Sequence, residues 1–286
     1  MDAIRGLPAW VVGEFVGTFI LVFFGCGSVC AAVTTGAEVG VFQVAIVWGL
    51  GIATAIYLTA ALSGAHLNPA VTISLAAWGG FPGSRVPGYI ATQIVAAFVA
   101  AALLYVIFGG AIAGFETRND IVRGQAGSEA SAMVFGEYFP NPQGKPLAQA
   151  DPDRMPWWRA FAAEVTGTAF LLLVIFCTTD ANNKDRPQIL TAATIGLTIT
   201  MLICLLGPLT MACFNPARDL GPRLFSSLAG WNTIPFTANG TGWFTVYIAA
   251  PIIGGWLGGL IYRVLFQGNY KAYKHAILSE DAPVKR

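Results

Sequence analysis

Long apolar stretches alternate with short polar ones along the whole chain, and this spacing predicts membrane-spanning helices. Each stretch holds about 20 residues or more, which is enough for a helix to cross a hydrocarbon core about 30 Å thick. Charged side chains gather between the stretches rather than within them. We therefore expect six spanning helices, at residues 9–33, 42–63, 87–110, 158–179, 188–207 and 243–266.

The composition agrees with a membrane protein. Hydrophobic residues make up 55% of the 286 residues and charged residues 11%, against about 25% charged in soluble domains. The first apolar stretch is longer than a signal-peptide core and lacks a convincing small-residue cleavage site, so we expect it to be retained. The five cysteines lie in or beside apolar stretches, which favours packing roles. A net charge of +1 gives no reason to expect nucleic-acid binding.

Basic residues near the span ends give a modest orientation signal. With six spans, the N-terminus, the second and fourth connections and the C-terminus share one side of the membrane. The long central connection, on the other side, mixes basic with acidic residues. Because basic residues favour the cytoplasmic side, we expect both termini in the cytoplasm and the protein in the inner or plasma membrane. The basic residues on the first side are Arg5, Arg85, Lys184, Arg186, Arg263, Lys271 and Lys274.

The two halves of the chain repeat one pattern. EFVGT at 14–18 corresponds to EVTGT at 164–168, YIATQI at 89–94 corresponds to YIAAPI at 247–252, and each half contains one Asn-Pro-Ala triplet. Each half contains three spans, an odd number, so the second half must enter the membrane from the opposite side. This predicts an inverted repeat about a pseudo-two-fold axis in the membrane plane. We expect a single domain over 1–286, with repeats at about 9–110 and 158–267 linked by the extramembrane segment 111–157.

The two triplets predict helices that start inside the membrane. Asparagine is a good N-cap, and proline fits the first helical position because no N–H is needed there. The segments 68–79 and 215–226 can cover only about 18 Å as helices, so each reaches halfway across. Inverted symmetry would bring both helix N-termini together near the midplane, where such backbone ends must line a cavity or be buried in protein. The triplets are Asn68, Pro69, Ala70 and Asn215, Pro216, Ala217.

Together these features resemble the major intrinsic proteins, the aquaporin superfamily. The resemblance covers nearly the whole chain and rests on HLNPA, FNPARD, the six spans and the EFVGT/EVTGT repeat. NPARDLGPR, VWGLGIATAIYLTA, TTDANN and the long central connection resemble the glycerol facilitator (aquaglyceroporin) branch. The resemblance implies an all-α, right-handed bundle of six transmembrane helices and two re-entrant half-helices. It also implies a homotetramer with one pore per subunit.

The resemblance also implies which residues select the solute. Arg218 follows Asn215 by one helical turn, whereas the equivalent position in the first half is Val71. An arginine inside a membrane is costly and by default functional. We expect Arg218 to donate hydrogen bonds to a solute and to repel cations, with Trp48 as an apolar wall of the same constriction.

The chain departs from the glycerol facilitators at two filter positions. Those proteins usually carry Phe three residues before the second triplet and Gly twelve residues before it, where this chain has Ala212 and Ile203. The predicted filter is Trp48, Ile203, Ala212 and Arg218, with an altered shape that keeps an apolar side and a cationic donor. Glycerol fits this filter, and so does a small undissociated hydroxy acid such as lactic acid.

Further polar residues are expected to support the pore. Glu14 and Glu164 occupy equivalent positions inside spans and need hydrogen-bond donors there. The resemblance implies that they accept backbone N–H groups from the re-entrant loops, which we favour over direct solute contact. His66 would offer either a ring nitrogen or only its backbone carbonyl to the solute, and both interpretations stay open. Asp219, a mark of the aquaglyceroporin branch, is placed with these supporting residues.

We therefore expect a passive channel for small uncharged solutes, chiefly glycerol and similar polyols, with some water and possible passage of urea or lactic acid. It would be no enzyme and would need no cofactor or metal. A coupled secondary transporter is the first alternative, but it would need an ion-binding cluster or a titrating relay near the midplane. An intramembrane enzyme would need a nucleophile with a base, or a metal cluster. A structural junction protein with an occluded pore is the remaining alternative.

Overall fold

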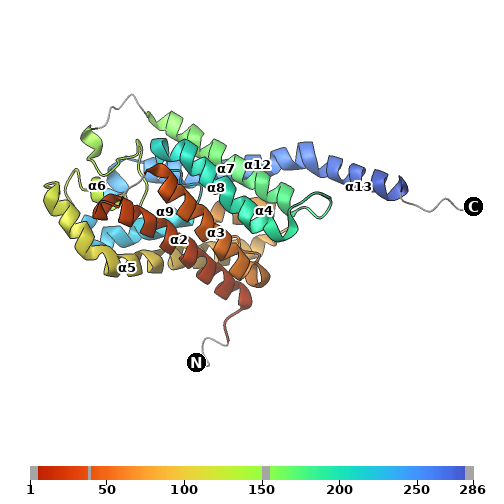
Figure 1. The fold of residues 1–286 in the computed structure, drawn as a ribbon, viewed down its shortest axis with the longest axis horizontal. Helices are drawn as coiled ribbons and strands as arrows, with labels where there is room; N and C mark the ends of the chain where they lie inside the picture. The colour runs from red at the N-terminus through yellow and green to blue at the C-terminus, as the bar shows by residue number, and fades with distance from the viewer. Residues whose placement is uncertain (1–5, 38–39, 150–154, 281–286) are drawn as a thin grey trace, which may run out of the picture.

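Six long apolar helices lie side by side in a bundle (Figure 1). The computed structural model describes residues 6–37, 40–149 and 155–280, with side chains as far as 274. Within these residues, six helical segments are long and apolar enough to cross a membrane, so the six expected spans are confirmed. They are Ala9–Thr35, Val41–Ser63, Gly83–Arg118, Trp157–Thr179, Gln188–Thr210 and Gly242–Lys274.

The spans contain the main helices, and shorter helical segments either extend these helices or lie in the connections. The last span is a continuous run of helical segments rather than one regular helix. The main helices are α2 (Ala9–Thr35), α3 (Val41–Ser63), α5 (Val86–Arg118), α7 (Trp157–Thr179), α8 (Thr191–Thr210) and α12 (Ala250–Ile261). The shorter ones are η1 (Gly83–Arg85), α6 (Glu129–Ala132), η2 (Leu147–Gln149), η3 (Gln188–Leu190), η4 (Ser227–Trp231), α10 (Ile234–Thr237), α11 (Gly242–Phe244), η5 (Thr245–Ala249), η6 (Tyr262–Gln267) and α13 (Gly268–Glu280).

Two half-length helices, α4 (Pro69–Trp78) and α9 (Pro216–Ser226), start at the Asn-Pro-Ala triplets. The Asn68 side chain accepts a hydrogen bond from the Ala70 N–H at 2.8 Å, and Asn215 caps α9 in the same way. Helix α4 packs mainly against α12, and α9 packs mainly against α5. The capping chemistry expected from the triplets is therefore present at both helix starts.

Glycines bring the spans close enough to bury the half-helices. A Cβ atom on Gly254 or Gly258 of α12 would lie 2.3 Å from a backbone oxygen of α7. One residue further on, a Cβ on Gly259 would lie 2.2 Å from the Trp78 ring of α4. Small residues let membrane helices approach backbone to backbone. The glycines of α12 thus let it contact the span α7 on one face and the half-helix α4 on another.

The connection between the halves starts later than expected. We predicted that it begins at residue 111, but α5 continues to Arg118. Ile112 is fully buried and Glu116, one turn later, pairs with Arg123 at 2.7 Å, so this last part of α5 packs against the protein. The chain then runs through α6 and loops as far as Trp157, where α7 begins.

The ends of the bundle can be followed in Figure 1. The turn between α7 and α8 and the helix α13 lie at one end, while α6 and the central connection lie at the other. Lys274 Nζ lies 3.4 Å from the Ala181 oxygen, which ties the start of the tail to the α7–α8 turn. Arg5, which contributed to the predicted orientation, lies outside the described residues.

Candidate functional site

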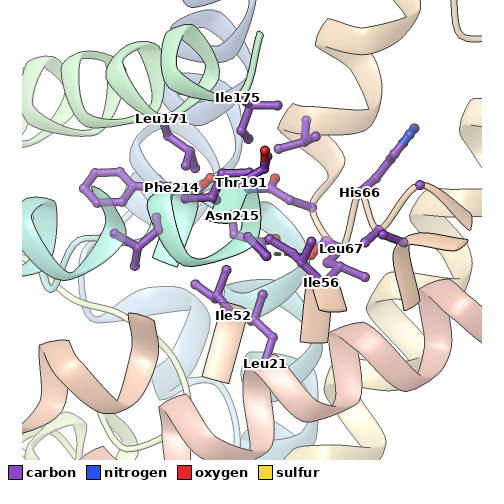
Figure 2. Close-up of a pocket in the computed structure, with 18 of the residues that line it drawn as sticks. Leu21, Ile52, Ile56, His66, Leu67, Leu171, Ile175, Thr191, Phe214 and Asn215 are labelled. Atoms are coloured by element: carbon purple, nitrogen blue, oxygen red, sulfur yellow. Dashed lines mark hydrogen bonds between the residues drawn. The ribbon is translucent and has the colours of Figure 1, made fainter. Parts of the chain in front are cut away.

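The N-termini of α4 and α9 face each other in the centre of the bundle. The Asn68 Nδ2 atom donates to the Phe214 carbonyl at 2.8 Å, and Asn215 Nδ2 donates to the Leu67 carbonyl at 2.9 Å. Figure 2 shows Asn215 and Leu67 together at the wall of a cavity. Each asparagine amide carries a second N–H, so one donor per residue stays free to meet a solute.

A buried carboxylate holds the loop before α4. Glu14 accepts the backbone N–H groups of His66 and Leu67 at 2.9 and 2.8 Å. It also accepts hydrogen bonds from the Ser63 hydroxyl and the Gln93 amide, both at 2.7 Å. Four neutral donors therefore stabilise this carboxylate inside the bundle, and its side chain lines neither of the cavities described below.

A second carboxylate holds the loop before α9 in the same way. Glu164 accepts the N–H groups of Cys213 and Phe214 at 3.1 and 2.9 Å and the Thr210 hydroxyl at 2.6 Å. Glu164 is fully buried and also lines neither cavity. Both glutamates thus contact the re-entrant loops rather than the space through which a solute would pass.

The loops held by these carboxylates have a strained backbone. Ala65 and Leu67 have φ angles of 50° and 54°, and the equivalent Ala212 and Phe214 have φ angles of 62° and 51°. Left-handed conformations of residues other than glycine cost about 1–3 kcal/mol each and need support from their surroundings. The hydrogen bonds to the glutamates give that support, because they fix the direction of successive N–H groups.

Two cavities share a boundary of a few residues, which we call the constriction. The inner cavity, of about 850 Å³, runs from the α7–α8 end past the half-helix starts. The outer cavity, of about 490 Å³, lies under the central connection. Trp48, Ile203 and Arg218 line both cavities, whereas Ala212 and His66 line only the inner one. Three of the four predicted filter residues therefore form the boundary between the cavities, and the fourth lies on its inner side.

Arg218 is buried at this boundary and is held by several contacts. Its Nη2 atom lies 2.6 Å from Glu137 Oε1, and Nη1 donates to the Phe135 carbonyl at 3.2 Å. The Cζ atom lies 4.5 Å from the centre of the Trp48 ring, within the range of a cation–π contact. The Trp48 ring in turn packs on Gly25, where a Cβ atom would come within 2.3 Å of it.

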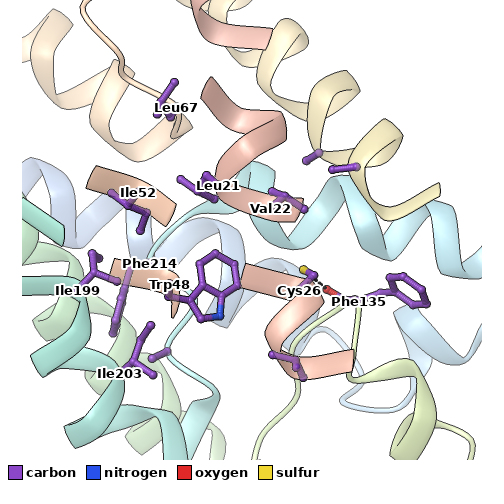
Figure 3. Packing of buried hydrophobic residues seen from close by; sticks show 14 of the residues in the cluster. Leu21, Val22, Cys26, Trp48, Ile52, Leu67, Phe135, Ile199, Ile203 and Phe214 are labelled. Carbon is purple, nitrogen blue, oxygen red and sulfur yellow. Dashed lines mark hydrogen bonds between the residues drawn. The ribbon is translucent and has the colours of Figure 1, made fainter. Parts of the chain in front are cut away.

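Apolar side chains surround the rest of the Trp48 ring. Figure 3 shows it among Ile203, Ile199 and Ile52, with Leu21 nearby. All of these residues belong to one buried cluster. The constriction thus has one apolar wall, from α3 and α8, and one charged wall from α9.

Sequence reasoning missed Glu137, which lines the outer cavity and pairs with Arg218. Its backbone N–H donates to Asp219 Oδ1 at 2.7 Å, and Asp219 is itself paired with Arg223 at 2.8 Å. Asp219 lines neither cavity and instead supports the loop. The available signal was a single acidic residue within the otherwise apolar run MVFGEYF at 133–139.

His66 lies beside the inner cavity, away from the constriction. Its Nδ1 atom is 3.2 Å from the Thr72 hydroxyl, and its ring packs on Phe81 and Tyr89 with centroid separations of 4.6 and 4.9 Å. Figure 2 shows the ring extended away from Asn215. An aromatic pocket therefore holds the ring, and the two interpretations of its role both stay predictions.

Comparison with known proteins extends these observations. A family model described as "Major intrinsic protein" matches residues 7–262. The chain is 44% identical over 255 residues to the glycerol uptake facilitator protein of Pseudomonas aeruginosa, covering 89% of this chain and 87% of that protein. It is 39% identical over 264 residues to a propanediol uptake facilitator of Citrobacter freundii, covering 92% and 94%.

A solved structure shares the fold. The X-ray structure of the aquaglyceroporin from Plasmodium falciparum superposes with a TM-score of 0.77 at 28% identity, covering 92% of this chain and 98% of that one. The expected all-α architecture and the resemblance to the glycerol facilitator branch are confirmed by these matches. The chain is a multi-pass membrane protein, and it belongs to the major intrinsic protein family.

Proposed function

We propose that this protein is a passive channel through which glycerol and similar polyols, with some water, cross the membrane down their gradients. The observation that carries the proposal is the pair of cavities that meet at Trp48, Ile203 and Arg218, beside two opposed half-helix N-termini. The relatives named as facilitators of glycerol and propanediol uptake support the same solute class.

The pathway suits a solute that has hydroxyl groups on one side and carbon on the other. A polyol can accept hydrogen bonds from Arg218 and from the free amide protons of Asn68 and Asn215, while its carbon edge rests on Trp48 and Ile203. Ions cannot recover their hydration in such a passage, so they are excluded. No bond is made or broken, and neither a cofactor nor a metal takes part in this transport.

Lactic acid in its undissociated form is a second candidate solute. It is favoured by Ala212, which puts a methyl group beside the constriction where glycerol facilitators usually have a ring. Such an acid has an apolar face and a polar end, and could therefore use the same wall of Trp48 and Ile203 opposite Arg218. Urea is a third solute for which the same donors would serve.

We extend the proposal to the assembly and its setting. The subunit would form a homotetramer with one pore in each copy, in the inner or plasma membrane. Both termini would be cytoplasmic, as favoured by Lys184, Arg186 and Lys274 at one end of the bundle. The equivalent hydrogen bonds of Glu14 and Glu164 support an inverted repeat within a single domain.

Stopped-flow light scattering on proteoliposomes tests the solute class. Glycerol, urea and water entry are compared with entry into empty vesicles, and lactate flux is assayed at acidic and neutral pH. Fast, non-saturating glycerol entry with little acid-dependent lactate flux is expected. Dominant lactate flux at acidic pH would transfer the assignment to the hydroxy acid. Saturation, or dependence on an ion gradient beyond solute speciation, would indicate a coupled transporter instead.

A further inference from the structure

A buried acid lies directly against the arginine of the constriction. Glu137 is 1% exposed, and its Oε1 atom lies 2.6 Å from Arg218 Nη2. Apart from this ion pair, neither carboxylate oxygen accepts a hydrogen bond from any residue that the structure describes. Arg218 therefore stabilises the negative charge of Glu137 through this ion pair.

A second ion pair places Glu137 at this position. Asp219 Oδ1 accepts the Glu137 N–H at 2.7 Å, and Arg223, paired with Asp219 at 2.8 Å, donates to the Glu137 carbonyl. Helix α9 carries Arg218, Asp219 and Arg223 together. The same half-helix thus presents the arginine and holds the loop that delivers its counter-charge.

Two buried ion pairs lie in this region. Arg218 is matched by Glu137 and Arg223 by Asp219, with all four side chains buried. Glu164 of α7, which holds the loop before α9, is bound by neutral hydroxyl and N–H donors instead. Without Glu137, the Arg218 guanidinium beside both cavities would have no carboxylate in contact with it, and a low dielectric strengthens the field of such a charge.

We propose that Glu137 is a specificity-determining residue of the channel, because its carboxylate neutralises Arg218 while leaving guanidinium N–H groups to donate to solutes. The constriction then offers hydrogen bonds to neutral hydroxyl compounds without a net charge that attracts small anions. This inference rests on the proposed channel function. It adds that selection against anions comes from the central connection and not from the spans.

Permeation of nitrate relative to glycerol tests the proposal. Nitrate is small and stays ionised, so its flux reports the charge at the constriction. Glu137→Gln keeps the side-chain shape and removes the charge, and it is expected to lower glycerol flux while raising the nitrate-to-glycerol ratio about tenfold. The matched control is Glu116→Gln, which removes the acid of another ion pair near the same connection and lines neither cavity.

The control is expected to leave the ratio at the wild-type value. If Glu137→Gln conducts glycerol with an unchanged ratio, Glu137 only holds the loop and the proposal is wrong. If vesicles with the wild-type protein admit no more glycerol than empty vesicles, the proposed function is rejected instead. The nitrate flux of Glu137→Gln could still be compared with that of the wild type.

A second set of variants keeps the test decisive if Glu137→Gln conducts nothing. Arg218→Gln leaves the Glu137 carboxylate unbalanced, so methylammonium permeation should rise about tenfold. Adding Glu137→Gln to that variant removes both charges and should return methylammonium permeation to the wild-type value. If the doubly substituted channel still conducts methylammonium as well as Arg218→Gln, charge compensation by Glu137 is rejected.

Discussion

The loops before α4 and α9 are built alike but lead to different side chains at the cavities. In each, a buried glutamate accepts two successive N–H groups and one hydroxyl, from Ser63 or from Thr210. In each, a tyrosine hydroxyl donates to the backbone oxygen of that hydroxyl residue, Tyr89 at 3.0 Å and Tyr247 at 3.1 Å. The backbone frame is therefore the same on both sides of the pathway.

The differences lie in the side chains that follow each asparagine. Val71 stands where Arg218 stands in α9, and Thr72 stands where Asp219 stands. Thr72 accepts a hydrogen bond from Gln93, whereas Asp219 pairs with Arg223. Of the two half-helices, only α9 carries ion-paired side chains, namely Arg218, Asp219 and Arg223. One backbone frame therefore serves both loops, while charged side chains follow the asparagine in only one of them.

The largest expected effect comes from making α9 like α4 by Arg218→Val. The change leaves Glu137 buried without a cation, and loss of one partner from a buried pair destabilises by about 3–5 kcal/mol. Unfolding in a detergent titration measures this loss. The control is Val71→Ala at the equivalent position, which removes apolar contacts only. An equal loss in both variants would mean that the ion pair does not stabilise the second half.

A smaller effect compares the two glycines of the repeated pentapeptides. A Cβ on Gly167 would lie 2.1 Å from the Phe214 ring, and one on Gly17 would lie 2.4 Å from a Leu67 methyl. A ring cannot move aside as a leucine methyl can, so Gly167→Ala should cost about 3 kcal/mol and Gly17→Ala about 1 kcal/mol. The same detergent titration gives both values. The reverse order would show that the first loop is the more rigid one.

Gly25→Ala tests the apolar wall of the constriction. The added methyl would lie 2.3 Å from the Trp48 ring and push it toward Arg218, whose Cζ atom is already 4.5 Å from the ring centre. We expect glycerol flux to fall about tenfold, the equivalent of roughly 1.4 kcal/mol, and water flux to fall less. Stopped-flow scattering with both solutes measures this. Equal losses for water and glycerol would place the effect outside the constriction.

The smallest expected effect is that of Ala212→Phe, which returns a ring beside the constriction. The ring should narrow the passage and raise the ratio of slim-polyol to branched-polyol flux by about threefold. This is less than the roughly tenfold discrimination of a tight apolar pocket. Competing polyols of different width measure the ratio. An untouched ranking of solutes would mean that Ala212 does not belong to the filter.

Local physical rules explain what could be predicted. The starts of α4 and α9 followed from asparagine caps and prolines, because capping involves neighbouring residues only. The predicted end of α5 at residue 110 was wrong. Burial of Ile112 and pairing of Glu116 extend that helix beyond the point where its apolar run stops. Glu137 was missed because its partner Arg218 is distant in the sequence.

The sequence by itself determined the six spans, the two half-helix starts and the membership of the family. Each of these depends on hydropathy, on capping or on short motifs, which act over a few neighbouring residues. Only the tertiary structure decided which groups meet at the constriction. The pairing of Glu137 with Arg218 and the packing of Trp48 on Gly25 join residues of separate elements. Such contacts depend on how the helices and the central connection pack, which no local pattern specifies.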